Sequence, residues 1–167
     1  MKKGHLKRTN IDIRMLLAKI DVKSEKKTKY IAEKLYNISK IGDVFAFTGD
    51  VGVGKTTLIR YFIRKGGKEN IITSPTYNIY FKYSSKKSTI FHLDAWRLKS
   101  DEEIINLGVT DFFYKSIFLI EWAEKIERFL PRNKLNIHIE YKKKNRIIYF
   151  KGDSSWVSRI KDLPNGY

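Results

Sequence analysis

The sequence feature that most constrains the fold is a glycine-rich segment, GDVGVGKT, at residues 49–56. A short run of β-branched and aromatic residues, 44–47, precedes it and predicts a buried strand. Apolar side chains then recur at helical spacing through residues 56–65, and two glycines end the pattern, which predicts a helix. A glycine-rich turn between a buried strand and a helix indicates a layered α/β structure.

The spacing of the segment matches G-x-x-x-x-G-K-[S/T], a pattern whose backbone cradles phosphate groups. Its glycines allow the main chain to wrap closely, so that successive N–H groups point at an anion beside the positive end of the helix. We expect Lys55 to reach the β- and γ-phosphates of a nucleotide and the Thr56 hydroxyl to bind Mg²⁺. The residues predicted to bind the nucleotide here are Gly49, Asp50, Val51, Gly52, Val53, Gly54, Lys55, Thr56 and Thr57.

Two acidic residues directly follow predicted strands, Asp94 after TIFHL and Glu121 after SIFLI. Carboxylates at the C-terminal ends of neighbouring strands can hold the metal ion and orient water for nucleotide hydrolysis. We therefore predict Asp94, Glu121 and Lys55 as catalytic residues, and Thr56, Glu121 and Asp94 as the metal site. The alternatives are a turn cap for Asp94 and a solvated acid in the next helix for Glu121.

Three further positions each allow two interpretations. Thr76, in the turn SPT, can sense a γ-phosphate or belong to an ordinary proline-led turn. Trp122, beside Glu121, is either packed in the core or a lid sensitive to nucleotide. His92, two positions before Asp94, is better explained as a neighbour with its own polar partners than as a metal ligand.

The remaining pattern completes a three-layer α/β/α arrangement with a mostly parallel sheet and antiparallel edge hairpins. Ser24 is a candidate N-cap for a helix ending near residue 39, and Ser100 for a helix at 101–107 with Glu103 as its capping-box partner. Trp156 and the tail after it are expected to dock on the core. The other predicted strands cover residues 77–83, 89–93, 116–120, 135–141 and 146–151.

Composition bounds the class of protein. The 167 residues suit one domain, which we place at residues 11–167 behind a basic flexible arm at residues 1–10. The absence of cysteine excludes disulfides, zinc ribbons, iron–sulfur clusters and a thiol nucleophile. With no long apolar run and no secretory pattern, we expect a soluble, cytoplasmic protein. The net charge of +16 has two interpretations: the lysines and arginines are solvated surface residues with no specific partner, or they form a surface that binds polyanions.

Several segments together resemble one family, the bacterial TsaE (YjeE) ATPases of tRNA threonylcarbamoyladenosine biosynthesis. The resemblance covers about residues 24–130. It rests on SEKKT, GDVGVGKTT, SPTYNIY, FHLDAWRL, DEEIINLGVTDFF and FLIEWAEKI. Of these, SPTY, HLDAWRL and IEW at their spacings are far more specific than the glycine-rich loop.

The resemblance implies a P-loop NTPase fold and a slow ATPase that uses ATP and Mg²⁺ and works with TsaB and TsaD. Those partners modify the adenosine next to the tRNA anticodon, so the resemblance implies that this protein reaches tRNA through the complex. Asp94 matches a Walker-B-like aspartate, and Thr56 with Glu121 matches the metal site. The other residues that the resemblance adds to the nucleotide site are Glu25, Thr28, Thr76 and Trp122.

Two other functions remain open from the sequence. A small P-loop kinase acting on a metabolite has a similar length and the same loop. A nucleic-acid-binding module in which ATP is incidental would account for the charge of +16, and its binding would weaken steeply with salt.

Overall fold

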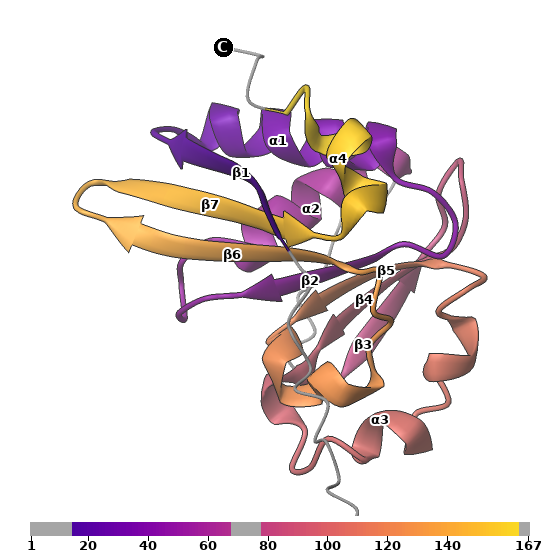
Figure 1. The fold of residues 1–167 in the computed structure, drawn as a ribbon. Coiled ribbons are helices and arrows are strands. Elements are labelled where there is room, and N and C mark those ends of the chain that lie inside the picture. Colours follow the sequence, from indigo (N-terminus) through magenta and orange to yellow (C-terminus); the bar gives the residue numbers. More distant parts are fainter. Residues whose placement is uncertain (1–14, 68–77, 164–167) are drawn as a thin grey trace, which may run out of the picture.

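The computed structural model describes residues 15–67 and 78–163, and its strands form one seven-stranded sheet (Figure 1). Three strand pairings are parallel and three are antiparallel, so the sheet is mixed and not mostly parallel as predicted. The expected antiparallel hairpins lie toward both edges. The order is β1 (Met15–Val22), β7 (Asn145–Gly152), β6 (Leu135–Lys142), β2 (Val44–Thr48), β5 (Ile117–Glu121), β4 (Ile90–Asp94) and β3 (Tyr80–Tyr83).

Helices cover both faces of the sheet (Figure 1). One face carries α1 (Glu25–Ile38), α2 (Lys55–Gly66) and α4 (Ser154–Ile160). The other carries α3 (Glu103–Asn106) and the 3-10 helices Ala95–Arg97, Thr110–Phe112 and Ala123–Phe129. Within the described residues, none of the helices has the length and apolar character needed to span a lipid bilayer.

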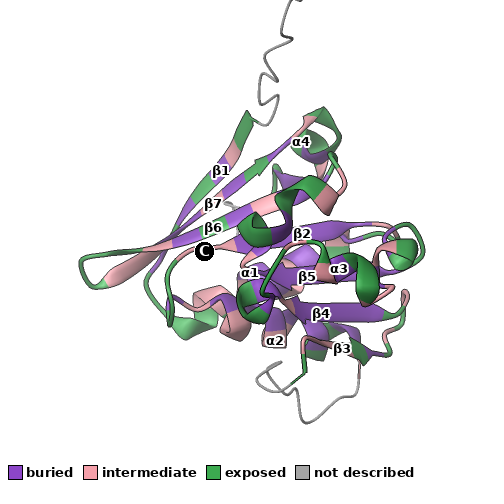
Figure 2. Cartoon of the chain, turned by 90° about the horizontal axis from the view of Figure 1, so that it is seen from below, coloured by how far each residue is buried: buried purple, intermediate pink, exposed green. Residues whose placement is uncertain are grey.

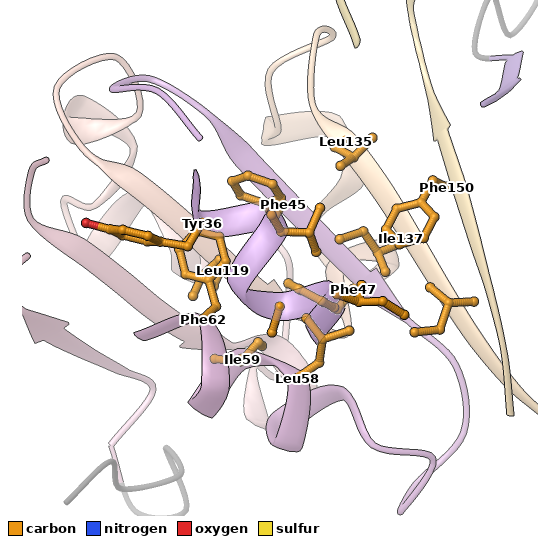
Figure 3. Close-up of a cluster of buried hydrophobic side chains, with 14 of the residues drawn as sticks. Tyr36, Phe45, Phe47, Leu58, Ile59, Phe62, Leu119, Leu135, Ile137 and Phe150 are labelled. Atoms are coloured by element: carbon orange, nitrogen blue, oxygen red, sulfur yellow. The ribbon is translucent and has the colours of Figure 1, made fainter. Parts of the chain in front are cut away.

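Strand β2 is buried on both sides, which explains its continuous apolar sequence. Phe45 and Phe47 pack toward α2, where they join Phe62 in the larger apolar cluster (Figure 3). Val44 and Ala46 point to the opposite cluster, beneath the short helices. Burying a phenylalanine side chain stabilises the fold by about 1.5–3 kcal/mol. The central strands are accordingly the most continuously buried part of the chain (Figure 2), and they give the loop after β2 a rigid base.

Most predicted elements are confirmed. β2, α2, β4, β5, β6 and β7 begin and end within one residue of the bounds predicted from the sequence. Ser24 caps α1, because its side-chain oxygen accepts a hydrogen bond from the Lys27 backbone N–H at 3.2 Å. Trp156 docks as expected, since it is 1% exposed and donates to the Asn133 carbonyl at 2.7 Å. The predicted arm at residues 1–10 lies outside the described residues, as does residue 77, the first of the strand predicted at 77–83. That strand begins later than predicted, at Tyr80, because residues 78 and 79 form a bend.

The helix predicted at residues 101–107 is wrong in length and in its cap. α3 spans only Glu103–Asn106, and Glu102, not Ser100, stands at its N-cap without a side-chain cap bond. The Glu103 carboxylate accepts instead from the Lys99 backbone N–H at 3.3 Å. Arg128 draws the Asp101 and Glu102 carboxylates into ion pairs, which favours a turn at the start of the predicted helix.

Among the strands and α-helices, β1 and α4 were not predicted, and neither was the 3-10 helix Thr110–Phe112. β1 carries a usable signal, because buried Ala18, Ile20 and Val22 alternate with exposed Lys19 and Asp21. α4 is a short helix whose burial depends on Trp156 and Ile160 meeting the core. A seven-residue helix is too short for periodicity to define it without that tertiary contact.

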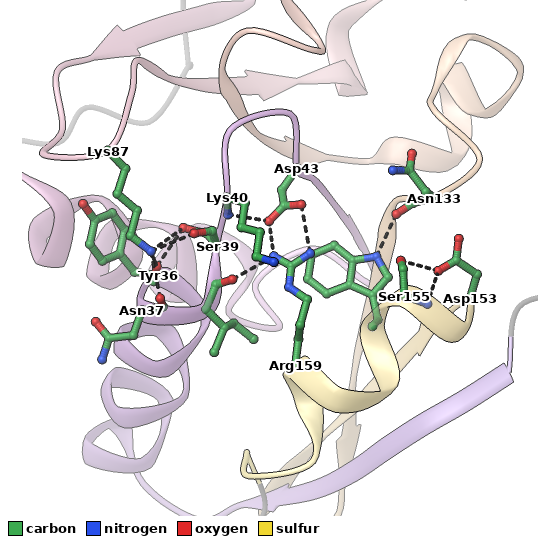
Figure 4. Close-up of polar contacts among 12 residues, drawn as sticks. Tyr36, Asn37, Ser39, Lys40, Asp43, Lys87, Asn133, Asp153, Ser155 and Arg159 are labelled. Atoms are coloured by element: carbon green, nitrogen blue, oxygen red, sulfur yellow. Dashed lines mark hydrogen bonds and ion pairs between the residues drawn. The ribbon is translucent and has the colours of Figure 1, made fainter.

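Cations neutralise the C-terminal end of α1 (Figure 4). The Lys87 ammonium donates to the Tyr36, Asn37 and Ser39 carbonyls at 2.6, 2.8 and 2.7 Å. Arg159 of α4 donates to the Ile38 carbonyl at 2.8 Å and forms an ion pair with the largely buried Asp43. These contacts satisfy carbonyls that have no partner within the helix and join α1, α4 and the start of β2.

We predict that Arg159→Met lowers the free energy of unfolding by about 3–5 kcal/mol, because it leaves the Asp43 carboxylate buried without its cation. Arg128→Met is the matched control. It breaks the ion pairs with Asp101 and Glu102, in which the arginine side chain is 56% exposed, and should cost about 1 kcal/mol or less. Urea denaturation of both variants measures the difference, and equal losses would contradict this account of the α1 terminus.

Candidate functional site

The glycine-rich loop joins the C-terminal end of β2 to the start of α2, and its glycines have backbone angles that other residues rarely adopt. The φ angles of Gly49, Gly52 and Gly54 are +123°, +75° and +113°. A Cβ atom at Gly49 would lie 2.1 Å from the carbonyl oxygen of Ile139 on β6. The chain can therefore turn at this position only with glycine.

The β6–β7 hairpin braces the loop, which sequence reasoning did not predict. The Tyr141 hydroxyl donates to the Gly52 carbonyl at 2.8 Å, and Arg146 Nε donates to the Val53 carbonyl at 2.7 Å. Because a trans peptide directs its C=O and N–H to opposite sides, the bond from Arg146 to the Val53 carbonyl turns the Gly54 N–H away from Arg146. The only signal in the sequence was the hairpin itself, since Tyr141 and Arg146 are register partners across it.

Lys55 begins α2 and lies folded over its own loop. Its ammonium donates to the Gly49 and Asp50 carbonyls at 2.6 and 2.8 Å and stands 4.0 Å from the centre of the Trp122 ring. Burial lowers the pKa of Lys55 below its ordinary value, while the Glu121 carboxylate and other nearby acids act in the opposite direction. An anion entering beside the loop would give this ammonium a charged partner in place of two carbonyls.

Thr56 and Glu121 are in direct contact. The Thr56 hydroxyl donates to both carboxylate oxygens of Glu121, at 2.9 and 2.8 Å. β2 and β5 are parallel neighbours, with Phe47 opposite Glu121, so the loop after β2 meets the end of β5. Glu121 is 4% exposed, so it is not the solvated acid considered as an alternative.

Asp94 ends β4 opposite Glu121, its register partner across the β4–β5 pair. Its Oδ1 accepts a hydrogen bond from the Trp96 backbone N–H at 2.9 Å, so Asp94 does cap the following 3-10 helix, as the alternative interpretation held. Burial, and more weakly the like charge of Glu121, raise the pKa of Asp94 against the effect of that hydrogen bond. The cap fixes one oxygen and holds the carboxyl group at the strand end.

Trp122 follows Glu121 with a φ of +56°, which places its ring over Lys55. The ring packs partly against the second apolar cluster and lies 4.4 Å from the half-exposed Trp96 ring, measured between centroids. Trp122 thus combines core packing with a place at the cleft. A left-handed backbone costs a non-glycine residue about 1–2 kcal/mol, so the packing around Trp122 has to offset that strain.

These groups line one cleft of about 300 Å³. A smaller pocket of about 170 Å³ adjoins the loop and is lined by Glu25, Thr28 and Arg146, with Gly52, Gly54 and Thr57 common to both. Val53 lines the smaller pocket, whereas Gly49 and Asp50 take part through the carbonyls that hold Lys55. Thr76 lies outside the described residues. The main cleft is lined by Val51, Gly52, Gly54, Lys55, Thr56, Thr57, Asp94, Trp96, Glu121 and Trp122.

The donor set suits Mg²⁺ with few protein ligands. The Thr56 hydroxyl donates its hydrogen bond to Glu121, which leaves the lone pairs of the hydroxyl oxygen for a cation. Residues 15–67 and 78–163 contain no group of three or more histidine, cysteine or acidic side chains arranged to hold a metal. Mg²⁺ prefers oxygen ligands and is usually bound by one or two carboxylates together with phosphates and water.

The two positive-φ glycines 49 and 52 give a test of the loop. Gly49→Ala should lower the free energy of unfolding by about 3 kcal/mol or more, because backbone strain adds to the clash with Ile139. Gly52→Ala has open space around its Cβ and should cost only the strain, about 1–2 kcal/mol. Chemical denaturation measures both, and a Gly49→Ala protein as stable as Gly52→Ala would show that the close approach to β6 is wrong.

Comparison with known proteins agrees with this arrangement. The family model "Threonylcarbamoyl adenosine biosynthesis protein TsaE" matches residues 22–148. A tRNA threonylcarbamoyladenosine biosynthesis protein TsaE from Rickettsia felis is 34% identical over 146 residues, 84% of this chain and 85% of that protein. The protein of the same name from Bacillus subtilis is 36% identical over 114 residues, 68% of this chain and 71% of its own.

The fold is shared with a solved structure. The crystal structure of YdiB from Bacillus subtilis superposes with a TM-score of 0.70 at 27% sequence identity, covering 90% of this chain and 93% of YdiB. The family match spans the glycine-rich loop, both strand-end acids, and Tyr141 and Arg146 of the bracing hairpin. With the relatives at 34% and 36% identity, it shows that the chain belongs to the TsaE family, whose members are named for tRNA threonylcarbamoyladenosine biosynthesis.

Proposed function

We propose that this protein is a P-loop ATPase subunit that serves tRNA threonylcarbamoyladenosine modification through ATP binding and slow, Mg²⁺-dependent hydrolysis. The observation that carries the proposal is the contact between Thr56, in the glycine-rich loop, and Glu121, at the end of β5. It joins a phosphate-binding turn to a buried carboxylate in a cleft that Asp94 also lines. Loop, helix start and strand-end acids together are the parts that a P-loop NTPase fold requires.

The chain's own groups divide the work of binding. The N–H groups at the start of α2 and the Lys55 ammonium would hold the β- and γ-phosphates. Glu25 and Thr28 line the smaller pocket on the α1 side of the loop, which supports a place for the rest of the nucleotide there. Trp122 covers Lys55 and would exclude water from the phosphates.

The metal would be held by Thr56 and Glu121, and Asp94, the register partner of Glu121, would take part through its carboxyl group. When bound, Mg²⁺ would neutralise charge on the phosphate oxygens and favour departure of the terminal phosphoryl group. Asp94 would hold an attacking water, and its place in the lining of the cleft, opposite Glu121 in the strand register, supports this role. The raised pKa of Asp94 suits a carboxyl group that accepts a proton.

The biological role follows from the family. Relatives 34% and 36% identical carry the name tRNA threonylcarbamoyladenosine biosynthesis protein, and the present chain covers most of their length. We propose that this chain acts in the same modification together with TsaB and TsaD in the cytoplasm, and meets tRNA through that assembly. The net charge of +16 would favour approach to such an RNA-containing complex.

Two substitutions test the proposal. Lys55→Ala should abolish nucleotide binding. Among the residues that the structure describes, Lys55 is the only lysine or arginine that lines the main cleft. Glu121→Ala should leave nucleotide binding largely intact and remove metal-dependent hydrolysis, since it takes away the partner of Thr56. Binding is measured with a fluorescent ATP analogue, and hydrolysis with the TsaB–TsaD pair present.

Equal hydrolysis by wild type and both variants would contradict the proposal. The same reactions, run with labelled ATP and a pool of nucleosides and small acids, also separate an ATPase from a metabolite kinase. An ATPase releases only ADP and phosphate, whereas a kinase makes a new phosphorylated product. Salt-sensitive tRNA binding that persists without nucleotide and without TsaB and TsaD would favour a nucleic-acid-binding module.

A further inference from the structure

His92 is a buried polar side chain that none of the proposed steps uses. It lies on β4, two residues before Asp94, and is 0% exposed. Its Nε2 atom stands 2.8 Å from Oε1 of Glu121 on the neighbouring strand. His92 is not among the residues that line the cleft, and its hydrogen bond to the site goes to Glu121.

The hydrogen bonding of His92 fixes which nitrogen carries the proton. An ionised carboxylate only accepts hydrogen bonds, so Nε2 has to donate to Glu121. Nδ1 is buried and has no hydrogen-bond partner among the described residues. An N–H group left without a partner in the interior is costly, which favours a ring with hydrogen on Nε2 and a bare lone pair on Nδ1.

Glu121 is consequently held from two sides. Oε1 accepts from His92 and from the Thr56 hydroxyl, and Oε2 accepts from the same hydroxyl. The terminal torsion of a glutamate is broad, so a carboxylate held only by Thr56 could rotate. The His92 bond comes from a different strand and restricts that rotation. It also orients the Thr56 hydroxyl, because the O–H bond of Thr56 points at the carboxylate to which it donates.

We propose that His92 is a positioning residue that sets the Glu121 carboxylate, and through it the Thr56 oxygen, in the orientation that receives Mg²⁺. The inference rests on the proposed function, because it assigns the metal to Thr56 and Glu121. His92 itself contacts neither nucleotide nor metal. It acts as the outer hydrogen-bonding partners of metal ligands do, by fixing the geometry of a ligand it touches.

Two amide substitutions separate this role from simple packing. In glutamine, the amide nitrogen is the same number of bonds from Cα as His92 Nε2, so His92→Gln keeps a donor for Glu121. In asparagine, the nitrogen corresponds to Nδ1, so His92→Asn loses that reach. Phe91→Leu is the matched control, since Phe91 is the neighbouring buried residue of β4 and packs in the apolar cluster on the other face.

The readout is the affinity of a fluorescent ATP analogue in EDTA and at increasing Mg²⁺, which gives the metal-free affinity and the gain from the metal. We expect His92→Asn to bind the analogue in EDTA as tightly as wild type does. The Mg²⁺ concentration that it needs for the same gain in affinity should be higher than that of wild type by about tenfold or more. His92→Gln and Phe91→Leu should stay close to wild type. Thermal unfolding of each variant confirms that folded proteins are compared.

Each outcome decides one question. A folded His92→Asn protein with the wild-type Mg²⁺ requirement overturns the inference, as does an equal rise for Phe91→Leu or a fall in metal-free affinity alone. If Mg²⁺ does not raise the affinity of the wild-type protein for the analogue, the metal site in the proposed function is wrong. Nitrogen NMR of the histidine rings in wild type serves even if a variant does not fold, because hydrogen on Nδ1 but not on Nε2 of His92 would also overturn the inference.

Discussion

The hydrogen bonds from Thr56 to Glu121 join the two segments on which the site depends. One segment is the glycine-rich loop after β2, and the other is the end of β5. They meet because β2 and β5 are parallel neighbours in the centre of the sheet, where both faces are buried and the strands cannot shift register without exposing apolar side chains. β4 follows on the far side of β5 and brings His92 and Asp94 to the same edge.

The loop is held from outside by the β6–β7 hairpin. The Tyr141 and Arg146 side chains bond to loop carbonyls, and the backbone of Ile139 fills the space that a side chain at position 49 would need. The shape of the loop is therefore held by contacts with the rest of the fold. A backbone that is already ordered lowers the entropy that binding of a ligand has to offset. The C-terminal hairpin thus belongs to the site as much as the loop does.

The sequence predicted the parts of this protein that depend on local pattern. The loop motif, the helix after it and the strands ending at Asp94 and Glu121 all follow from periodicity, glycine spacing and position. It did not predict β1, whose pairing partner β7 lies more than a hundred residues away in the chain. Ser100 failed as a cap because Arg128, from a distant helix, draws the neighbouring acids into ion pairs. The hydrogen bond from Arg146 to the loop and the contact between His92 and Glu121 are likewise tertiary. Each joins residues far apart in the sequence, so no local pattern predicts it.

A crystal structure with Mg²⁺ and a non-hydrolysable ATP analogue tests the central claim most directly. The account predicts phosphates enclosed by the loop at residues 49–56, the Lys55 ammonium moved from its carbonyl partners onto phosphate oxygens, and the metal in contact with the Thr56 oxygen beside Glu121. Nucleotide bound elsewhere with this loop empty, or a metal far from both Thr56 and Glu121, would contradict it.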